Sequence, residues 1–231
     1  MNLHWTFTTR KGGVSTPPFS AFNLGSHVGD DPAAVAANRR ELLAQTGVDA
    51  VVWMDQVHSA TVAVVDGPRA DPVPATDGLV TAVPGLALAV LVADCVPILA
   101  GDPDSGVVGV AHAGRVGAAD GIGLRLLERM VEQGAERDRI TVVLGPAICG
   151  RCYEVPAAMQ AAVAGRLPGS AVETASGTPG LDLRVGLEAQ LAGAGLGRVQ
   201  RSVRCTCEDT ELFSHRRQAP TGRQAGVIWF E

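Results

Sequence analysis

The stretch that most constrains the fold is Leu86–Gly117, in which one long apolar run is followed by two shorter ones. The first run, Leu86–Val92, is unbroken and predicts a strand. Turn-forming residues at Asp102–Gly106 separate the two shorter runs, Ile98–Ala100 and Val107–Ala111. Turn residues between two β-prone runs are typical of a β-hairpin.

The predicted hairpin carries a cysteine and a histidine near each other. We expect Gly101 to pair with Val107 across a five-residue loop. In that register Val96 faces His112, and Cys95 lies one residue away. Directly opposed residues have Cβ atoms about 4.5–5.5 Å apart. The fold would therefore let one thiol and one imidazole share an ion or a proton.

Two chemistries fit this pair. In the first, Cys95 and His112 bind a soft-to-borderline metal such as zinc, with His58 as a third ligand from another strand-like segment. Two histidines and one cysteine leave a fourth tetrahedral position open, as a catalytic zinc requires. In the second, Cys95 is a nucleophile and His112 is its base.

Composition narrows the class of protein. The chain has 231 residues, no linker of biased composition and a hydrophobic fraction of 46%, so we expect one domain, 1–231, with a large core. Aromatic residues at 4% and a net charge of −5 argue against nucleic-acid binding. The N-terminus resembles no signal peptide, and no apolar stretch is long enough to span a membrane. The odd number of cysteines, 5, favours thiols or metal ligands in a reducing cytoplasm.

Periodicity and capping signals predict an alternation of strands and helices. Strands are predicted at Leu3–Thr9, Val51–Met54, Thr61–Val65, Ile140–Leu144, Val199–Val203 and Val227–Phe230. Helices are predicted from Pro32 to about Gly47, after Gly121, at Pro156–Leu167 and at Leu183–Leu191. We expect Asn38, Arg39 and Arg40 to form the solvated face of the first helix, and Asp77 to bond its own backbone in a turn.

Three further segments have two interpretations each. The loop around Arg10, with Lys11 and two glycines, is either an anion cradle or an ordinary turn. Arg216, Arg217 and Arg223 are either anion ligands or part of a solvated loop. Four cysteines in a CxxC and a CxC arrangement are either a second metal site or small buried thiols. These cysteines are Cys149, Cys152, Cys205 and Cys207.

Taken together, eight short motifs in order resemble one known family. The motifs are Thr9–Ser15, Phe22–Gly25, Gln56–His58, Thr76–Gly78, Ala93–Pro97, Ala111–Gly114, Cys152–Val155 and Phe213–Arg217. They are similar to those of the laccase-domain, or multicopper polyphenol oxidoreductase, family, also called peptidoglycan editing factor. The resemblance covers almost the whole chain.

The resemblance implies a mixed α/β (α+β) sandwich with two central sheets between helical layers. It also implies a Zn²⁺ site at His58, Cys95 and His112, and a purine nucleoside phosphorylase acting on adenosine, inosine and methylthioadenosine, with adenosine deaminase activity. Copper (Cu²⁺) is less favoured, because the chain has neither His-x-His pairs nor a blue-copper ligand set. In this scheme a purine nucleoside and phosphate are the partners, and Asp94 orients a ligand or acts as an acid or base.

We expect phosphate and substrate to be bound by a set of polar residues near the metal. This set comprises Arg10, Asn23, Arg216 and Arg223. One departure from the family pattern concerns the residues after Ala111–Gly114. The family usually continues with Trp-Arg-Gly, whereas this chain has Arg115 and Val116 before Gly117. If the chain is extended there, the arginine side chain points to the opposite face.

Three other functions compete with zinc-dependent nucleoside chemistry. One is a Cys–His hydrolase or amidase, in which Cys95 attacks, His112 is the base and Asp94 or His58 orients it; this would suit peptidoglycan precursor editing. The other functions are a copper-dependent polyphenol oxidase and a metal-stabilised module that binds a partner. Metal content separates the zinc-dependent nucleoside enzyme from the Cys–His hydrolase, because a hydrolase of this type needs no ion.

Overall fold

The computed structural model describes residues 2–196 and 198–231. A four-stranded sheet has the order β1 (Leu3–Phe7), β12 (Gln224–Phe230), β5 (Leu86–Val92) and β2 (Ala50–Val52). A six-stranded sheet has the order β11 (Val199–Arg201), β8 (Thr141–Leu144), β6 (Val96–Asp102), β7 (Val107–Ala113), β4 (Gly78–Thr81) and β3 (Val62–Val64). A small third sheet pairs β9 (Ala171–Glu173) with β10 (Pro179–Leu181).

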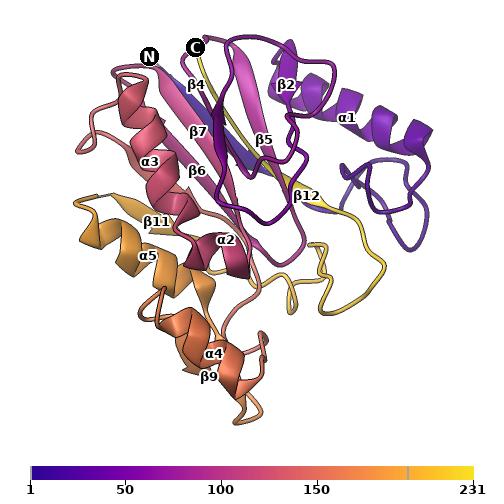
Figure 1. Cartoon of the computed structure of the whole chain (residues 1–231). Coiled ribbons are helices and arrows are strands. Elements are labelled where there is room, and N and C mark those ends of the chain that lie inside the picture. The colour runs from indigo at the N-terminus through magenta and orange to yellow at the C-terminus, as the bar shows by residue number, and fades with distance from the viewer. Residues whose placement is uncertain (1, 197) are drawn as a thin grey trace.

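Helices lie on both outer sides of the two larger sheets. These are α1 (Pro32–Thr46), α2 (Arg115–Ala119), α3 (Ile122–Glu132), α4 (Ala157–Ala164) and α5 (Leu183–Gly193). Figure 1 shows α1 on one side of the sheets and α3 with α5 on the other. The predicted α+β sandwich with central sheets flanked by helices is therefore confirmed.

The central strands are apolar along their whole length because each strand buries both faces. In β5, Leu88 and Val90 point between the two sheets, whereas Ala87 and Ala89 point toward α1. Successive side chains of a strand face opposite ways, so an unbroken apolar run fills two cores at once.

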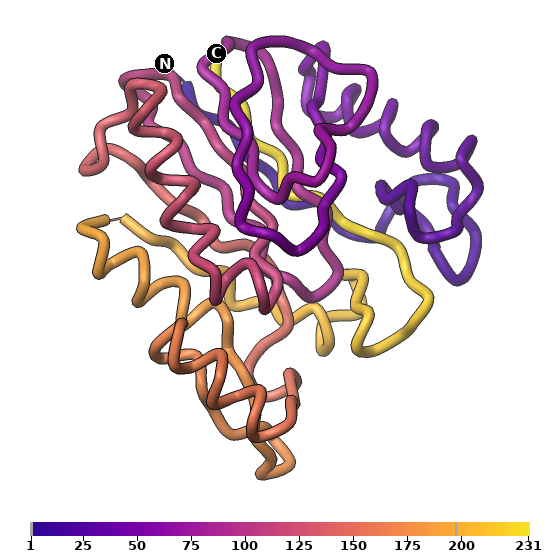
Figure 2. Tube along the Cα trace, in the orientation of Figure 1, coloured from indigo at the N-terminus to yellow at the C-terminus, as the bar shows by residue number. Residues whose placement is uncertain are grey.

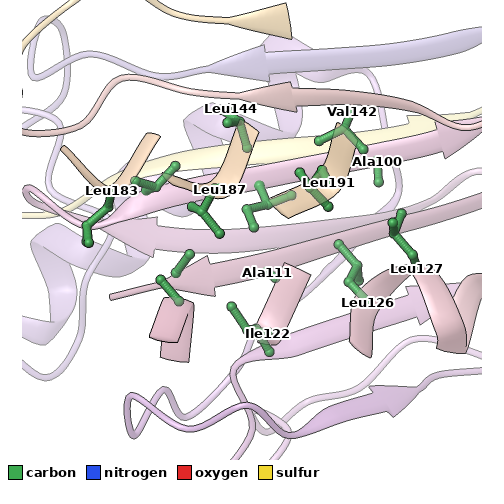
Figure 3. Close-up of a cluster of buried hydrophobic side chains, with 14 of the residues drawn as sticks. Ala100, Ala111, Ile122, Leu126, Leu127, Val142, Leu144, Leu183, Leu187 and Leu191 are labelled. Carbon is green, nitrogen blue, oxygen red and sulfur yellow. The ribbon is translucent and has the colours of Figure 1, made fainter. Parts of the chain in front are cut away.

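A further core lies between the six-stranded sheet and the leucine-rich faces of α3 and α5 (Figure 3). Leu126 and Leu127 of α3 and Leu187 and Leu191 of α5 are fully buried. They pack against small or branched strand residues such as Val142. Leu126 and Leu127 fall on one face of α3 with Ile122 and Met130, as the helical periodicity predicts.

The hairpin of β6 and β7 is formed, but its register differs by one residue from the prediction. Asp102 pairs with Val107, so His112 faces Pro97 and not Val96. The turn is one residue tighter because the Asp102 carboxylate accepts hydrogen bonds from the backbone N–H groups of Asp104 and, at 3.5 Å, Ser105. A side chain that caps its own turn extends the paired strand by one residue.

The first helix forms as predicted, but its polar side does not face solvent. Asp31 caps the N-terminus and Gly47 adopts a left-handed conformation at the C-terminus. Asn38 is only 1% exposed, because the loop that precedes the helix folds over it. Arg39 donates to the carbonyl of Leu24 and stacks 4.1 Å from the ring centre of Trp53. Of Asn38, Arg39 and Arg40, only Arg40 is exposed as predicted.

Candidate functional site

Three side chains from separate parts of the fold form a cluster with metal-ligand chemistry. His58 lies in the loop before β3, Cys95 just before β6, and His112 near the end of β7. One ligand atom of each lies within 4.8 Å of the others. The Cys95 sulfur is 4.0 Å from Nε2 of His58, and the two imidazole centroids are 4.7 Å apart in an edge-on arrangement. We call this group the histidine–cysteine cluster.

Asp77 organises the cluster from beneath. Its Oδ1 atom lies 2.8 Å from Nδ1 of His112, and its carboxylate accepts hydrogen bonds from the backbone N–H groups of Val57, His58 and Ser59. Asp77 is fully buried, so these donors replace its hydration. Because Nδ1 of His112 is occupied, Nε2 remains as its available ligand atom. The same carboxylate therefore sets the tautomer of one histidine and the backbone of the other.

The three charges shift one another's protonation. Burial alone would raise the pKa of Asp77, but hydrogen bonds from His112 and Ser59 lower that pKa to about 2. Burial opposes charge on Cys95 too, yet His112 and His58 lower the pKa of the thiol to about 6. His112 responds in the opposite sense, because Cys95 and Asp77 raise its pKa to about 9 despite burial. The cluster thus favours a thiolate at neutral pH, the form that binds metals and attacks electrophiles.

Asp94 has an unusual backbone conformation next to Cys95. Its φ angle is 98°, which L-residues with a side chain rarely adopt. Its carboxylate accepts a hydrogen bond from the Thr206 hydroxyl at 2.6 Å and one from the backbone N–H of Arg216 at 2.7 Å. Asp94 therefore holds the loop after β11 against the turn between β5 and β6 that carries Cys95, and this anchoring accounts for the strained turn.

Gly114, at the N-terminus of α2, leaves room for the cluster. A Cβ atom at this position would lie 2.7 Å from Cδ2 of His58 and 3.3 Å from the Cys95 sulfur. Any side chain would have to displace the imidazole. The glycine of the Ala111–Gly114 motif is therefore explained by the close approach of two ligand side chains to the backbone.

The histidine–cysteine cluster lies in a cavity of about 370 Å³. That volume is within the range of roughly 300–1,000 Å³ typical of small-molecule sites. The wall carries four histidines, three arginines and one tyrosine among apolar residues. Its lining residues are His27, Gln56, His58, Leu91, Val92, Ala93, Asp94, Cys95, His112, Arg115, Ile148, Tyr153, Leu183, His215, Arg216 and Arg223.

Of the four residues predicted to bind substrate or phosphate, two reach this cavity. Arg216 and Arg223 line it, and Arg223 is largely buried, which lowers its pKa. Arg10 does not line it: its guanidinium stacks 5.1 Å from the ring centre of Phe213. Asn23 is fully buried, and its Oδ1 accepts from the backbone N–H of Arg223 at 2.8 Å. The structure thus places Arg10 and Asn23 in loops behind the cavity wall and not on the wall itself.

The polypeptide after Gly114 is helical, not extended. Because α2 begins at Arg115, neighbouring side chains differ by about a third of a turn and do not alternate between faces. Arg115 points into the cavity, and Val116 is 41% exposed. The departure from the family pattern therefore removes an aromatic side chain but leaves a guanidinium on the cavity wall.

Sequence reasoning did not identify several residues of this site. Asp77 was expected to bond its own turn, and its contact with His112 spans 35 residues that no local pattern connects. Tyr153 lies in the Cys152–Val155 motif, which supported the family resemblance but gave this residue no role in the site. His27 belongs to a long irregular segment, and segments of that kind are often functional. Its pKa is lowered by burial and by Arg223.

The fold and the site define a class: an α+β protein with two imidazoles and a thiolate converging in a small-molecule cavity. Thiolate and imidazole are the donors preferred by zinc and copper, and Asp77 supplies the outer hydrogen bond that such ligands usually have. The residues therefore fit a bound transition metal. The chain belongs to the family described as multi-copper polyphenol oxidoreductase laccase, whose model matches residues 4–231.

Relatives and solved structures agree with this assignment. A purine nucleoside phosphorylase of Mycobacterium tuberculosis is 56% identical over 97% of this chain and 90% of its own length. One of Streptomyces griseus is 53% identical over 100% and 95%. The crystal structure of YlmD from Geobacillus stearothermophilus has a TM-score of 0.92 at 36% identity, covering 99% of this chain and 92% of that one.

A further crystal structure, of Neisseria meningitidis protein NMB0706, has a TM-score of 0.89 at 33% identity. It covers 100% of this chain and 95% of that one. Within the described residues, none of the helices has the length and apolarity needed to cross a membrane.

Proposed function

We propose that this chain is a metal-dependent purine nucleoside phosphorylase acting on adenosine, inosine and methylthioadenosine, and that the same cavity deaminates adenosine. One observation carries the proposal: the histidine–cysteine cluster and the guanidinium groups of Arg115, Arg216 and Arg223 line one cavity. Relatives named purine nucleoside phosphorylase support the same reaction class.

His58, Cys95 and His112 would hold the metal, with zinc favoured over copper. When bound, zinc would supply a Lewis acid that polarises an oxygen of the reactant. The chain itself contributes the orientation of the ligands. The Asp77 carboxylate accepts hydrogen bonds from Nδ1 of His112 and from the backbone N–H of His58. Both ligands are therefore preorganised before a reactant enters.

Phosphorolysis requires a phosphate oxygen to form a bond to the anomeric carbon while the bond from that carbon to the purine nitrogen breaks. The electron pair leaves with the purine, which gains a proton. We assign Arg216 and Arg223 to hold the phosphate, because guanidinium groups bind phosphate oxygens in pairs. Asn23 supports this arrangement by holding the backbone N–H of Arg223. Positioning the nucleophile in this way lowers the barrier mainly through entropy.

The purine would lie against Tyr153. The Tyr153 ring lines the cavity, with the guanidinium carbon of Arg216 at 5.2 Å from its centre. Stacking on an aromatic face accepts adenine and hypoxanthine alike, which agrees with the proposed range of nucleosides. We assign the proton transfer to the leaving base to His27 or His215, which also line the cavity.

We further propose that residues 1–231 work as one catalytic unit in the cytoplasm. Pairing of β1 with β12 supports the first part, because it joins segments from both ends of the chain. Five cysteines, all free in the described structure, suit a reducing compartment.

The decisive experiment follows adenosine with and without phosphate while adenine, inosine and ribose 1-phosphate are measured. Release of adenine that depends on phosphate marks a phosphorylase, and inosine formed without phosphate marks a deaminase. His58→Ala should lose both activities together with the zinc of the histidine–cysteine cluster. Arg40→Ala, on the exposed side of α1, serves as the control and should retain them. Formation of neither product by the zinc-loaded protein would contradict the proposal.

A Cys–His hydrolase is the second candidate, and one observation favours it. Cys95, His112 and Asp77 are arranged as nucleophile, base and orienting acid, and the pKa of Cys95 is lowered to about 6. Asp77, and neither Asp94 nor His58, makes the hydrogen bond to Nδ1 of His112. An active metal-free protein that is inactivated by alkylation of Cys95 would favour this function. A zinc content of one ion per chain at this site, lost in His58→Ala, would favour the phosphorylase.

A further inference from the structure

A second group of side chains with metal-ligand chemistry lies outside the cavity. Cys149, Cys152 and Cys205 each offer a sulfur, and Glu208 offers a carboxylate oxygen. These four atoms lie within 4.8 Å of one another. We call this group the three-cysteine cluster. The sequence pattern indicated Cys207 as the fourth member, but the structure places Glu208 there.

The backbone holds two of the three sulfurs in place. Cys149 begins a tight turn, in which the backbone N–H groups of Cys152 and Tyr153 both donate to its carbonyl at 3.0 Å. This turn brings Cys152 back beside Cys149, which is the usual geometry of a CxxC metal half-site. The backbone N–H of Cys149 also points at the sulfur of Cys205, at 3.3 Å. A donor aimed at sulfur stabilises the thiolate form that a metal requires.

Cys205 and Glu208 come from a second segment that is fixed independently. Residue Cys205 pairs with Ala147 in an isolated bridge, and the N–H of Thr206 donates to the carbonyl of Ala147. The N–H of Asp209 donates to the carbonyl of Cys205, which turns the chain so that Glu208 reaches Cys152 at 3.5 Å. The two halves of the cluster are thus assembled by backbone hydrogen bonds and not by the side chains alone.

The four ligand atoms have few hydrogen-bond donors among them, although they lie within 4.8 Å of one another. A divalent cation would replace the thiol protons and would bind all four atoms at once.

We propose that Cys149, Cys152, Cys205 and Glu208 bind a structural zinc ion, separate from the ion of the histidine–cysteine cluster. Three thiolates select a soft-to-borderline ion over magnesium or calcium. Four protein ligands close the coordination sphere, as in structural and not catalytic zinc sites. This proposal does not depend on the proposed function.

The position of the three-cysteine cluster explains what such an ion would stabilise. Tyr153, on the cavity wall, directly follows Cys152. Thr206, directly after Cys205, donates to the carboxylate of Asp94. Arg216 donates to the carbonyls of Cys152 and Glu154. The ion would therefore fasten the two loops that carry Tyr153 and Arg216 into the cavity.

Zinc content of the purified full-length protein, measured by mass spectrometry, tests the proposal. Cys205→Ser should hold one zinc ion per chain fewer than the unaltered protein. Cys207→Ser is the matched control, since its sulfur lies outside the cluster, and should lose none. His58→Ala should lose one ion by a different route, and the double variant with Cys205→Ser should lose both. Equal zinc in Cys205→Ser and the unaltered protein would overturn the proposal.

Thiol alkylation of the unaltered protein tests the proposal without any variant. In the zinc-loaded protein Cys149, Cys152 and Cys205 should be protected and Cys207 should react, and a chelator should expose all of them. Cys152 is the most informative site, because it is partly exposed and an alkylating reagent can reach it. Alkylation of these three at the rate of Cys207, or a disulfide between any two of them in protein purified with zinc and reductant, would overturn the proposal.

Discussion

Asp77 and His112 form a buried pair in which Oδ1 of the carboxylate lies 2.8 Å from Nδ1 of the imidazole, with exposures of 0% and 3%. The pair links the strand that carries His112 to the loop that carries His58, because the same carboxylate holds three backbone N–H groups of that loop. Loss of this one side chain should disturb both histidines together.

Asp77→Asn should weaken zinc binding at the histidine–cysteine cluster about 10–100-fold, the usual effect of removing the outer partner of a metal-binding histidine. The amide oxygen can still accept hydrogen bonds from some of the backbone N–H groups. The neutral side chain can no longer stabilise a positively charged or metal-bound His112. Competition with a coloured chelator measures the change. Asp71→Asn, at an exposed turn, should leave affinity unaltered. Unchanged affinity in Asp77→Asn would show that His112 is not a ligand.

Gly114→Ala should disrupt the cluster by steric displacement. The added methyl group would lie 2.7 Å from Cδ2 of His58, which is closer than such atoms approach. A misplacement of about 1 Å can cost about a hundredfold in rate, so we expect turnover and zinc retention to fall together. Gly193→Ala is the control, because a Cβ there meets no atom within 4 Å and the position ends α5. Full zinc occupancy and turnover in Gly114→Ala would contradict the geometry.

Asp102→Asn should destabilise the hairpin at neutral pH by about 1–3 kcal/mol, because the amide would face the N–H of Glu136 with a donor of its own. Burial raises the pKa of Asp102, but hydrogen bonds from Glu136, Ser105 and Asp104 lower it overall. Its contribution is therefore complete above the unfolded pKa of about 3.9 and is lost as pH falls through the lower folded pKa.

Urea unfolding at pH 7 and at about pH 3 checks this expectation. The difference in unfolding free energy between the two proteins should be large at pH 7 and should shrink in acid. Asp104→Asn, which is exposed, gives the baseline for losing one carboxylate in the same turn. A difference that stays constant with pH would mean that the Asp102 charge does not stabilise the hairpin.

Arg223→Ala should raise the KM for phosphate by about ten- to a hundredfold, because a hydrogen bond to a charged group contributes about 1.5–3 kcal/mol. The rate of adenosine deamination should change less, since that reaction uses water in place of phosphate. Initial rates at varied phosphate and varied adenosine separate the two effects. An equal loss in both reactions would place Arg223 in the support of the cavity and not in phosphate binding.

The sequence predicted the convergence of His58, Cys95 and His112, although the hairpin register was wrong by one residue. The proximity survives the error because Cys95 precedes β6 and follows Asp94, whose positive φ turns the chain toward the histidines. Local patterns cannot show such a turn, because it depends on the Asp94 carboxylate reaching Thr206, which is 112 residues further along.

The misassigned face of α1 has a similar cause. A helical pattern shows which side chains share a face but not what covers that face. The Asn38 side chain accepts a hydrogen bond from the backbone N–H of Val14. It donates to Ser15 and to carbonyls of the loop that precedes the helix. Only the folded loop supplies these partners. Helices and central strands were predictable because their apolar periodicity is local, whereas Asp77 and Tyr153 join the site through contacts distant in sequence.

The order of strands in the four-stranded sheet bears on synthesis. Strand β12 lies between β1 and β5 and pairs with both. Figure 2 shows that the first and last parts of the chain lie close together. A ribosome therefore delivers both outer partners long before the strand that joins them. Until then their inward edges have no native neighbour, so a nascent chain carries two unpaired strand edges that invite association and a chaperone would shield.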